Sequence, residues 1–445
     1  MNERLTRIEP PKSPRGTEDL FEPQLLKIEA VTGRLFKEAR AWGFTRIDLP
    51  TFEHDEVFRR TAEFSEDTSY LFSDKSGRPL VLRPDINAPI TRAVINNLSS
   101  APSPIKLFFA DKVFRYRHVS KREFRMFGLE TYGVSSPLAD AEVLRVAANV
   151  VEDLGFSGYE IEYGNLQIYY KFLQEIVGRI QNPPDSRTLF HKLRSAKDMS
   201  LATSILKDSN VTSEDSEKLL TMLFSSGKDD ESFSILETLS RGSKAIEEEL
   251  EKTKRFREAL QEFDLNNTRL SLSNLHGNGF YSGFTYRLTP GGSPMPLVDG
   301  GRYDTMAESL GGNKTPATGL GLGIERLIYL AEQQNILIGE SQSRKGVIIS
   351  FEQDQLRADL RPILQAAREN GFILEEELVK RKPGQMRRYA ANKGYQHAIS
   401  VSEQNVDGRN AYQVKVHSLE KDDEERTFAL ENKDDLMNLL NILSK

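Results

Sequence analysis

Between residues 78 and 133, strand-like runs follow one another closely, and this succession limits the fold more than any other feature of the chain. The runs are RPLVLRP, IKLFFA, KVFRYR and EFRMFGLETYG, with short turns and one brief helical segment, APITRAVINN, among them. Parallel strands need regular crossover helices, and this region has no such pattern. The sequence therefore predicts an antiparallel sheet with helices packed on it.

Two long helices are predicted on either side of these strands. Residues 22–42 carry apolar side chains three and four positions apart and are followed by Gly43. The segment PLADAEVLRVAANVVEDLG has Pro137 near its start and Gly155 just past its end, as is typical of a helix. Between residues 43 and 53, GFTRIDLPTFE is predicted to be a strand that ends at Pro50.

The pattern divides the chain into an interrupted first domain and a smaller second one. From about residue 184 to 262 it is helical and polar, and strand-like runs then resume at TRLSLSN, GFYSGFTYRL and MPLVDGG. We therefore predict an α+β domain over residues 1–335, with a sheet built from both sides of a helical insertion. Beyond a linker, a βαβαβ pattern predicts a compact α/β domain over residues 345–445.

Composition excludes several classes of protein and site. The chain has no cysteine, which excludes disulfides, thiolate zinc sites and a cysteine nucleophile. No apolar run approaches the roughly 20 residues that span a bilayer, and the N-terminal residues lack the apolar core of a signal peptide. We therefore expect a cytoplasmic protein without membrane contact. The net charge of −6 gives no overall attraction to nucleic acid.

One basic stretch departs from this overall charge. Six basic residues lie between Lys112 and Arg125 against the single acid Glu123, and aromatic residues alternate with the arginines. Such a pattern suits a pair of strands that faces a polyanion or a nucleotide. The alternative is a charged face that is simply solvated.

The glycine-rich segment TGLGLGIERLIYL, residues 318–330, is similar to a dinucleotide-binding fingerprint. That fingerprint must follow a buried strand, whereas GGNKTPAT, which precedes this segment, has the composition of a loop. We therefore expect the glycines to permit close packing of a strand on a helix. Arg326 is then directed toward an anion.

Three polar residues are candidates for ligand contacts. Glu130 shares one face of its predicted strand with Gly128, and a carboxylate there needs either a nearby arginine or a ligand. Asp85 and Asn87 stand where a strand ends and a helix begins. They are therefore either helix-capping residues or ligand contacts.

Seven segments, in this order, resemble the histidyl-tRNA synthetase family. They are RGTEDL (15–20), GFTRIDLPTFE (43–53), LRPDINAP (82–89), FRYR…REFRMFGLE (114–130), DAEVL (140–144), GGRYD (300–304) and TGLGLGIERL (318–327). The resemblance covers nearly the whole chain and implies a class II aminoacyl-tRNA synthetase-like fold with a C-terminal anticodon-binding-like domain. Residues 43–53 match the dimer-forming motif of the family, which implies a homodimer.

The segment LHGNGFYSG departs from the synthetases at a position that they use in catalysis. There, the matching segment carries an arginine that activates the histidine carboxylate, whereas this chain has His276, followed by Gly279 in place of an aspartate. An imidazole is mostly neutral at pH 7 and cannot form the bidentate fork of a guanidinium. His276 therefore marks a loss. No second histidine or carboxylate has metal-ligand spacing, so we expect no metal site.

Three further departures point the same way. Asp85 replaces a ligand-contacting glutamate of the family, and Met126 replaces a glutamine. The loop HVSK is shorter than the synthetase loop that meets ATP and the tRNA acceptor end. The retained residues are Arg115, Glu130, Tyr281 and Arg326. The resemblance thus implies a pocket that binds a ligand but does not make adenylate efficiently.

Within the family, this profile resembles the regulatory subunit of ATP phosphoribosyltransferase. That branch pairs with a short catalytic subunit in the first step of histidine biosynthesis and helps it respond to histidine. The resemblance implies a homodimer within a hetero-oligomer, histidine as the ligand, no catalytic residues and no cofactor. The implied ligand contacts are Asp85, Asn87, Arg115, Glu130, Phe280, Tyr281 and Arg326.

Two alternatives follow from the same resemblance. Many regulatory subunits have a reduced or missing C-terminal domain, whereas this chain keeps residues 345–445. A divergent histidine–tRNA ligase would use Arg115 and Arg326 for ATP. A tRNA-binding paralogue would act through its C-terminal domain, where the segment KRKPGQMRRYAANKG is basic.

Overall fold

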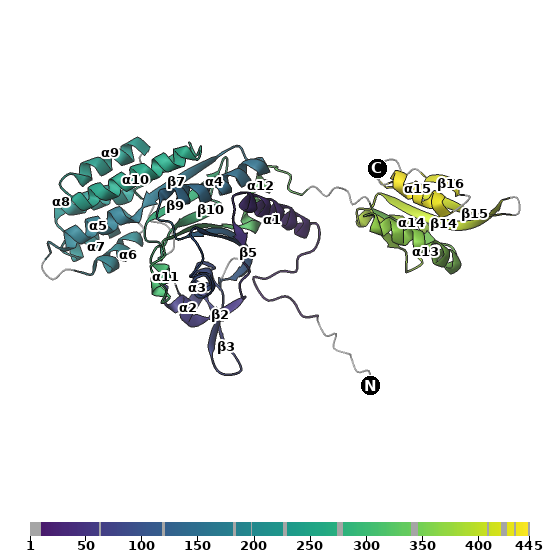
Figure 1. Cartoon of the computed structure of the whole chain (residues 1–445), viewed down its shortest axis with the longest axis horizontal. Helices are drawn as coiled ribbons and strands as arrows, with labels where there is room; N and C mark the ends of the chain where they lie inside the picture. The colour runs from purple at the N-terminus through teal and green to yellow at the C-terminus, as the bar shows by residue number, and fades with distance from the viewer. Residues whose placement is uncertain are drawn as a thin grey trace, which may run out of the picture. The chain divides into compact units, whose positions relative to one another are not determined.

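The structure is a computed structural model of the chain, and it comprises two compact units, Met1–Ile338 and Gly339–Lys445 (Figure 1). The first predicted domain ends at residue 335 and the second begins at residue 345, so the two predicted bounds lie on either side of this division. The residues that the structure describes are 10–61, 64–117, 121–180, 184–196, 198–225, 229–273, 279–339, 346–406, 409–419, 425–430 and 433–443.

An eight-stranded sheet forms the centre of the first unit. Its strand order is β1-β5-β6-β11-β10-β9-β7-β8. All pairs from β5 to β7 are antiparallel, and the two edge pairs, β1 with β5 and β7 with β8, are parallel. The predicted α+β class with an antiparallel sheet is therefore confirmed. The strands are β1 (Thr45–Arg46), β5 (Ile105–Phe114), β6 (Glu123–Tyr132), β7 (Tyr159–Asn165), β8 (Thr268–Leu270), β9 (Phe284–Pro290), β10 (Val298–Arg302) and β11 (Ala317–Gly323).

Helix α4 (Pro137–Leu154) covers one face of this sheet, where it contacts β6, β11, β10 and β9. The Ser136 side chain accepts a hydrogen bond from the Leu138 N–H at its start, and Pro137 occupies the first turn. Gly155 ends the helix with φ at +98°, a left-handed conformation that glycine adopts without strain. Helices α1 (Gln24–Ala41) and α12 (Ile324–Gln333) pack against each other, and α1 also contacts α4.

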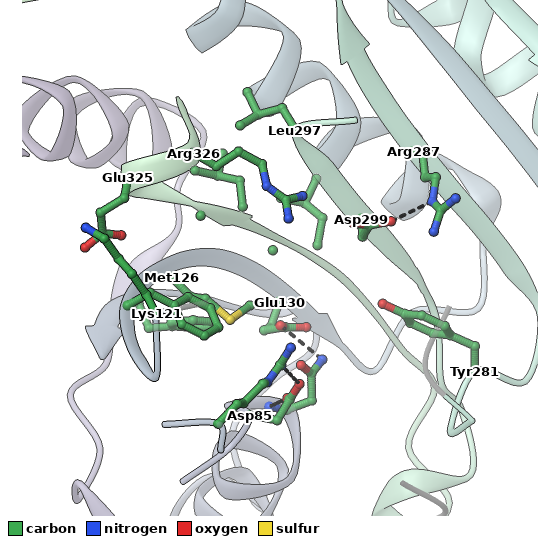
Figure 2. A pocket seen from close by; sticks show the side chains of 18 of the residues that line it. Asp85, Lys121, Met126, Glu130, Tyr281, Arg287, Leu297, Asp299, Glu325 and Arg326 are labelled. Carbon is green, nitrogen blue, oxygen red and sulfur yellow. Dashed lines mark hydrogen bonds and ion pairs between the residues drawn. The ribbon is translucent and has the colours of Figure 1, made fainter. Parts of the chain in front are cut away.

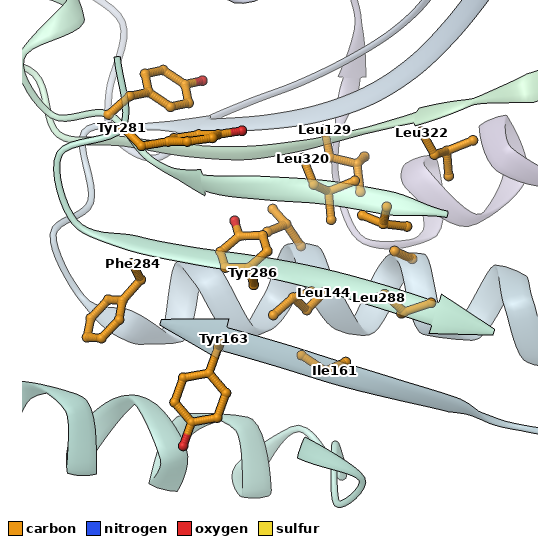
Figure 3. Packing of buried hydrophobic residues seen from close by; sticks show 14 of the residues in the cluster. Leu129, Leu144, Ile161, Tyr163, Tyr281, Phe284, Tyr286, Leu288, Leu320 and Leu322 are labelled. Atoms are coloured by element: carbon orange, nitrogen blue, oxygen red, sulfur yellow. The ribbon is translucent and has the colours of Figure 1, made fainter. Parts of the chain in front are cut away.

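The helical insertion is fastened to the other end of the sheet by aromatic packing. It comprises α6 (Ser186–Arg194), α7 (Met199–Asp208), α8 (Ser213–Phe224), α9 (Asp229–Ser240) and α10 (Lys244–Glu262). Phe256 of α10 stacks on Phe284 with ring centroids 4.5 Å apart and meets Tyr163 edge-on at 5.2 Å. Figure 3 shows Tyr163 and Phe284 among the buried residues of β7 and β9. Strand β7 and helix α5 (Leu166–Val177), which join this insertion to the sheet, were not predicted.

The segment 43–53 differs from the single strand that its sequence predicts. It forms the two-residue β1 and, after Pro50, the separate strand β2 (Phe52–His54). The buried guanidinium of Arg83 accounts for the break, because its Nη1 donates to the carbonyl oxygens of Leu49 at 2.7 Å and Pro50 at 3.2 Å. Strand β2 belongs to a small sheet of order β2-β4-β3, with β4 (Pro79–Leu82) and β3 (Tyr70–Ser73).

Short helices accompany the small sheet and the loops near it. They are α2 (Asp55–Arg59), the 3₁₀ helix η1 (Glu66–Thr68), α3 (Asn87–Asn97) and α11 (Met306–Ser309). Helix α3 contacts both α2 and α11. It begins one residue after the segment LRPD, and its first residue, Asn87, reaches Glu130 of β6 in the central sheet.

The second unit has its own core and a five-stranded mixed sheet of order β13-β12-β14-β15-β16. Strand β12 pairs in parallel with β13 and β14, as the βαβαβ pattern predicts, and β14, β15 and β16 are antiparallel. Its elements are β12 (Gly346–Phe351), α13 (Asp354–Glu369), β13 (Ile373–Glu376), α14 (Pro383–Asn392), β14 (His397–Val406), β15 (Arg409–Ser418), β16 (Glu425–Leu430) and α15 (Lys433–Leu443). Across both units, none of the helices that the structure describes has the length and apolar character needed to cross a bilayer.

Candidate ligand-binding site

A cavity of about 700 Å³ lies on the central sheet over β6, β11 and β10 (Figure 2). The cavity lies on the face of the sheet opposite α4. Thr318 of β11 hydrogen-bonds Asp140 of α4, whereas the next residue, Gly319, lies against Glu130. Side chains alternate between the two faces of a strand, so these two residues mark the two faces. The lining residues are Asp85, Asn87, Phe109, Arg115, Arg117, Lys121, Phe124, Met126, Glu130, Arg194, Tyr281, Arg287, Leu297, Asp299, Leu320, Gly321, Leu322, Gly323, Glu325 and Arg326.

Glu130 of β6 is a buried acid on the wall of this cavity. Its side chain is 1% exposed, and it accepts hydrogen bonds from the Tyr303 hydroxyl and, at 3.4 Å, from Asn87 Nδ2. Among the residues that the structure describes, it has no ion-pair partner. Burial raises the pKa of Glu130 well above its usual range; the bond from Tyr303 opposes this effect and the charge of Asp85 adds to it.

Asp85 is held at the start of α3, next to the cavity. Its Oδ1 accepts the backbone N–H of Asn87 at 2.8 Å, and its Oδ2 lies 3.3 Å from Nη2 of Arg115. Arg115 also donates from Nε to the carbonyl of Pro84 at 2.7 Å. Asp85 therefore bonds the first backbone N–H of the helix and also faces the cavity, so the two interpretations of this residue from sequence are compatible.

The basic stretch of β5 and β6 contributes two guanidinium groups to the cavity. Arg115 and Arg117 lie over the ring of Phe124, at 5.6 and 5.7 Å from its centroid. Burial and then the charges of Arg115 and Arg326 lower the pKa of Arg117. Three guanidiniums that repel one another favour an anion between them. Three other basic residues of the stretch form ion pairs: Lys112 with Glu123, Lys121 with Glu18 and Arg125 with Glu325.

The two aromatic residues that were predicted as one wall share a neighbouring cavity of about 600 Å³, but only Tyr281 of the two lines the main one. Tyr281 lines the main cavity, where Figure 2 shows its hydroxyl directed inward. Phe280 lies in the wall of two neighbouring cavities of about 600 and 110 Å³. Their rings remain in contact, with centroids 4.8 Å apart. The sequence placed both side chains near the site but could not assign the direction of each.

The glycines of β11 make room for side chains of β6, rather than for a helix as expected from sequence. A Cβ atom on Gly319 would lie 1.7 Å from Oε2 of Glu130, and one on Gly321 would lie 2.9 Å from Cε of Met126. Met126 itself lines the cavity beside Leu320 and Leu322, so part of its wall offers no hydrogen bond. Arg326, in the first turn of α12, faces the cavity and donates to the carbonyl of Pro296 at 3.2 Å.

Sequence reasoning missed several other charged residues of the cavity, including Glu325. Arg287 and Asp299 are directly opposite each other on β9 and β10, and Arg287 Nε lies 2.7 Å from Asp299 Oδ1. Arg194 comes from α6 in the insertion. Neither the Arg287–Asp299 pair nor Arg194 could be placed without the strand register and the position of the insertion. His276 and residues 118–120 of the short loop lie outside the described residues.

Among the described residues, no group of three or more histidine, aspartate or glutamate side chains is placed to hold a metal ion. The cavity instead offers carboxyl groups at Asp85 and Glu130 and guanidinium groups at Arg115, Arg117 and Arg326. Such a combination suits a small zwitterion or a ligand with separate cationic and anionic groups.

Comparison with known proteins identifies related sequences. A model of the histidyl-tRNA synthetase family matches residues 16–327. The histidine–tRNA ligase of Pyrobaculum islandicum is 30% identical over 321 residues, which cover 71% of this chain and 74% of the relative. The ATP phosphoribosyltransferase regulatory subunit of Acetivibrio thermocellus is 26% identical over 92% of this chain and 95% of its own.

Solved structures agree on the fold. A protein of Bacillus halodurans described as an ATP phosphoribosyltransferase regulatory subunit/histidyl-tRNA synthetase has a TM-score of 0.73 at 21% identity, over 88% of this chain and 98% of its own. The apo histidyl-tRNA synthetase of S. aureus has a TM-score of 0.67 at 21% identity, over 96% and 99%. The fold is therefore that of the class II histidyl-tRNA synthetase-like proteins.

Proposed function

This chain belongs to the histidyl-tRNA synthetase family, and from that premise we propose that it is a non-catalytic regulatory subunit of an ATP phosphoribosyltransferase that binds histidine in the cavity over β6 and β11. Glu130 carries the proposal. It is a buried carboxyl group on the cavity wall that has no cation beside it among the described residues. Ionisation of such a group is costly until a cation reaches it, and a ligand ammonium or imidazolium is such a cation.

The charges around the cavity support an amino acid as the ligand. Glu130 supplies a carboxyl group, Arg117 and Arg326 supply guanidinium groups, and Asp85 and Arg115 pair with each other at 3.3 Å. A zwitterion presents both charges at once, so each can meet its opposite. Tyr281 adds an aromatic surface against which an imidazole ring can pack.

The chemistry that is missing supports binding without catalysis. Met126 gives the wall an apolar side chain at a position where the synthetases have a glutamine, and position 276 holds histidine where they have the activating arginine. Loss of an interaction made mainly in the transition state typically lowers the rate on the order of a hundredfold or more. Regulatory subunits are also among the relatives, and one of them aligns over 92% of this chain.

A divergent histidine–tRNA ligase is the second candidate, and one observation favours it. Arg115 and Arg326 border the same cavity, where they could meet the phosphates of ATP. Several relatives are named histidine–tRNA ligases, including the one at 30% identity. Measurement of adenylate formation separates the two candidates.

We also expect a homodimer, through the motif at residues 43–53. Phe52 of β2 and Phe72 of β3 support this, because they are 53% and 41% exposed and pack edge-on with ring centroids 6.1 Å apart. Two exposed aromatic rings side by side suit a contact with a second copy. Light scattering that shows only a 50 kDa monomer at micromolar concentration would count against the dimer.

Reconstitution tests the proposed function. The purified chain is mixed with a short catalytic subunit of ATP phosphoribosyltransferase, and the rate of phosphoribosyl transfer is followed with and without histidine. We expect the two chains to copurify and the rate to fall when histidine is added. Glu130→Gln should still copurify but need roughly tenfold more histidine for the same response. No copurification and no change in rate would reject the proposal.

A further inference from the structure

Tyr303 stands directly after β10, in the segment GGRYD, and its side chain reaches the cavity acid Glu130. The ring is 0% exposed, and its hydroxyl donates a hydrogen bond to Oε2 of Glu130. Tyr303 is not among the described residues that line the main cavity. Any effect of Tyr303 on a ligand in that cavity therefore passes through another side chain.

Backbone hydrogen bonds hold the segment that carries Tyr303. The N–H of Tyr303 donates to the carbonyl of Ala317 at 2.8 Å, and the side chain of Asp304 accepts the N–H of Ala317 at 3.0 Å. The N–H of Asp304 donates to the Ser282 hydroxyl at 2.9 Å. The end of β10, the start of β11 and the segment before β9 are thus joined at Tyr303, so its Cα position follows from the fold.

Two aromatic rings hold the ring of Tyr303. Phe280 meets it edge-on with ring centroids 5.7 Å apart, and Tyr132 meets it edge-on at 6.2 Å. The hydroxyl of Tyr132 bonds Thr91 of α3 at 3.0 Å and lies 3.5 Å from that of Tyr303. The phenol group is therefore held beside Glu130 before any ligand enters the cavity.

The two oxygens of Glu130 have different surroundings. Oε2 accepts the bond from Tyr303 and lies against β11, where a Cβ atom on Gly319 would be 1.7 Å away. Oε1 lies toward the start of α3, where it accepts a long bond of 3.4 Å from Asn87 and where Asp85 also lies (Figure 2). One oxygen is therefore committed to the fold, and the other is left for a stronger partner.

Tyr303 also affects how readily Glu130 ionises. Burial raises the pKa of Tyr303 well above its usual range, so its hydroxyl keeps its proton and remains a donor. A donor on a carboxylate favours the ionised form, and the bond from Tyr303 opposes the rise that burial causes in the pKa of Glu130. The titratable groups that act on Glu130 from the surrounding elements are Asp85, Tyr132, Tyr281, Tyr286 and Tyr303.

We propose that Tyr303 is a positioning residue of the ligand site, which holds the Glu130 carboxylate through Oε2 so that Oε1 meets the cationic group of the amino-acid ligand. This assignment rests on the proposed function, because it takes histidine as the ligand. It gives the segment GGRYD a role in binding, although the tyrosine does not touch the ligand. The whole effect of the Tyr303 hydroxyl on affinity must then depend on Glu130.

A double-mutant cycle tests this dependence by calorimetry with L-histidine on the full-length chain. Tyr303→Phe removes the hydroxyl and keeps the ring, and we expect it to weaken binding roughly tenfold. In the Glu130→Gln background, the same substitution should change affinity by less than about twofold. The matched control is Tyr163→Phe, which removes another buried hydroxyl that donates to a carboxylate, that of Asp229 at 3.5 Å. It should bind histidine as its parent does in both backgrounds.

The pH dependence of the loss gives a second readout. Without its donor, the pKa of Glu130 should rise further, so ionising this carboxyl group for the ligand cation costs more in Tyr303→Phe than in wild type. That extra cost disappears once the pH exceeds both pKa values. The ratio of the two affinities, in which the titration of histidine itself cancels, should therefore be larger at about pH 6 than at about pH 8.5.

The outcomes separate the positioning role from the proposed ligand. Wild-type affinity in Tyr303→Phe, an equal loss in both backgrounds, or a loss that is the same at every pH would overturn the positioning role and leave the proposed histidine site standing. A wild-type chain that binds no histidine would overturn the proposed ligand, and the role of Tyr303 with it. Thermal unfolding of each variant checks that a loss of binding is not a loss of structure.

Discussion

A buried carboxyl group lies on each side of strand β11, Asp140 of α4 on one side and Glu130 of β6 on the other, and the partners of these two groups differ. On the α4 face, Asp140 is 0% exposed and pairs with the guanidinium of Arg302, with Thr318 as a second donor. On the cavity face, Glu130 is 1% exposed, and its partners are a tyrosine hydroxyl and an amide. Burial raises the pKa of both carboxyl groups, and within the described part of the chain a cation opposes that rise only at Asp140, where it is Arg302.

This difference distinguishes a structural acid from an acid that serves a ligand. The pair of Asp140 and Arg302 joins α4 to β10 with its charges already matched. Glu130 lacks that match among the described residues, yet the strand beside it keeps a glycine, Gly319, where a methyl group would collide with its carboxylate. Burial of an ionised carboxylate without a cation costs free energy, and a ligand cation in the cavity would offset that cost.

Asp140→Ala should have the largest effect on stability. It leaves the guanidinium of Arg302 buried without its main partner, and loss of one member of a buried pair typically costs about 3–5 kcal/mol. Urea unfolding measures this. Asp153→Ala on the same helix is the control, because Asp153 is exposed and should change stability by less than about 1 kcal/mol. Equal stability of the two variants would contradict a structural role for Asp140.

Gly319→Ala should disturb the cavity face of the sheet, where Glu130 lies. The new methyl group must displace the Glu130 carboxyl, and overpacking of this kind costs about 1–3 kcal/mol. We also expect histidine binding to be lost in calorimetry. Gly321→Ala is the matched control on the same strand, since its methyl group meets only the flexible end of Met126 and should have a smaller effect. Wild-type binding by Gly319→Ala would place the ligand elsewhere.

Glu130→Gln should separate binding from stability. The amide keeps the size of the side chain and needs no cation, so the free energy of unfolding should equal or exceed that of wild type. Histidine affinity should fall roughly tenfold, as expected for one charge-assisted hydrogen bond. Calorimetry and urea unfolding on the same samples give both values. If the variant is much less stable and binds histidine normally, Glu130 is a structural acid like Asp140.

The pH dependence of the free energy of unfolding should also differ between wild type and Glu130→Gln, and we expect this to be a smaller effect. The pKa of Glu130 is raised in the folded chain, so folding retains its proton while the unfolded chain loses it near pH 4.3. The stability of wild type relative to the variant should therefore fall as pH rises from about 4.3 through the raised pKa. A ligand cation favours the ionised form, so histidine binding should release a proton from wild type alone. Calorimetry in two buffers of different ionisation enthalpy measures that release.

The sequence predicts the elements whose signals are local. Helix α4 is marked by Pro137 and Gly155 at its ends, and the second unit by the regular alternation of strands and helices. Strand β1 is shorter than predicted because the carbonyls of Leu49 and Pro50 bond the side chain of Arg83, a contact between segments 33 or 34 residues apart. No local pattern encodes such a bond.

The candidate site shows the same limit. Asp85, Glu130, Arg115 and Arg326 could be named from sequence because motifs mark them, and the structure gathers all four around one cavity. Which cavities Phe280 and Tyr281 each line depends on the turn before β9. The Arg287–Asp299 pair depends on strand register, and Arg194 on the packing of the insertion. These are tertiary features, and a periodicity in one segment cannot reveal them.

Histidine-dependent exchange of pyrophosphate into ATP tests most directly whether the cavity binds histidine without activating it. The purified chain is assayed beside a histidine–tRNA ligase at equal concentration, with calorimetry to confirm that histidine is bound. We predict binding with no exchange above background, because the cavity has carboxyl groups for the ligand cation but an apolar Met126 and no arginine at position 276. Exchange at a rate comparable with that of the ligase would contradict a regulatory role and establish the chain as an enzyme.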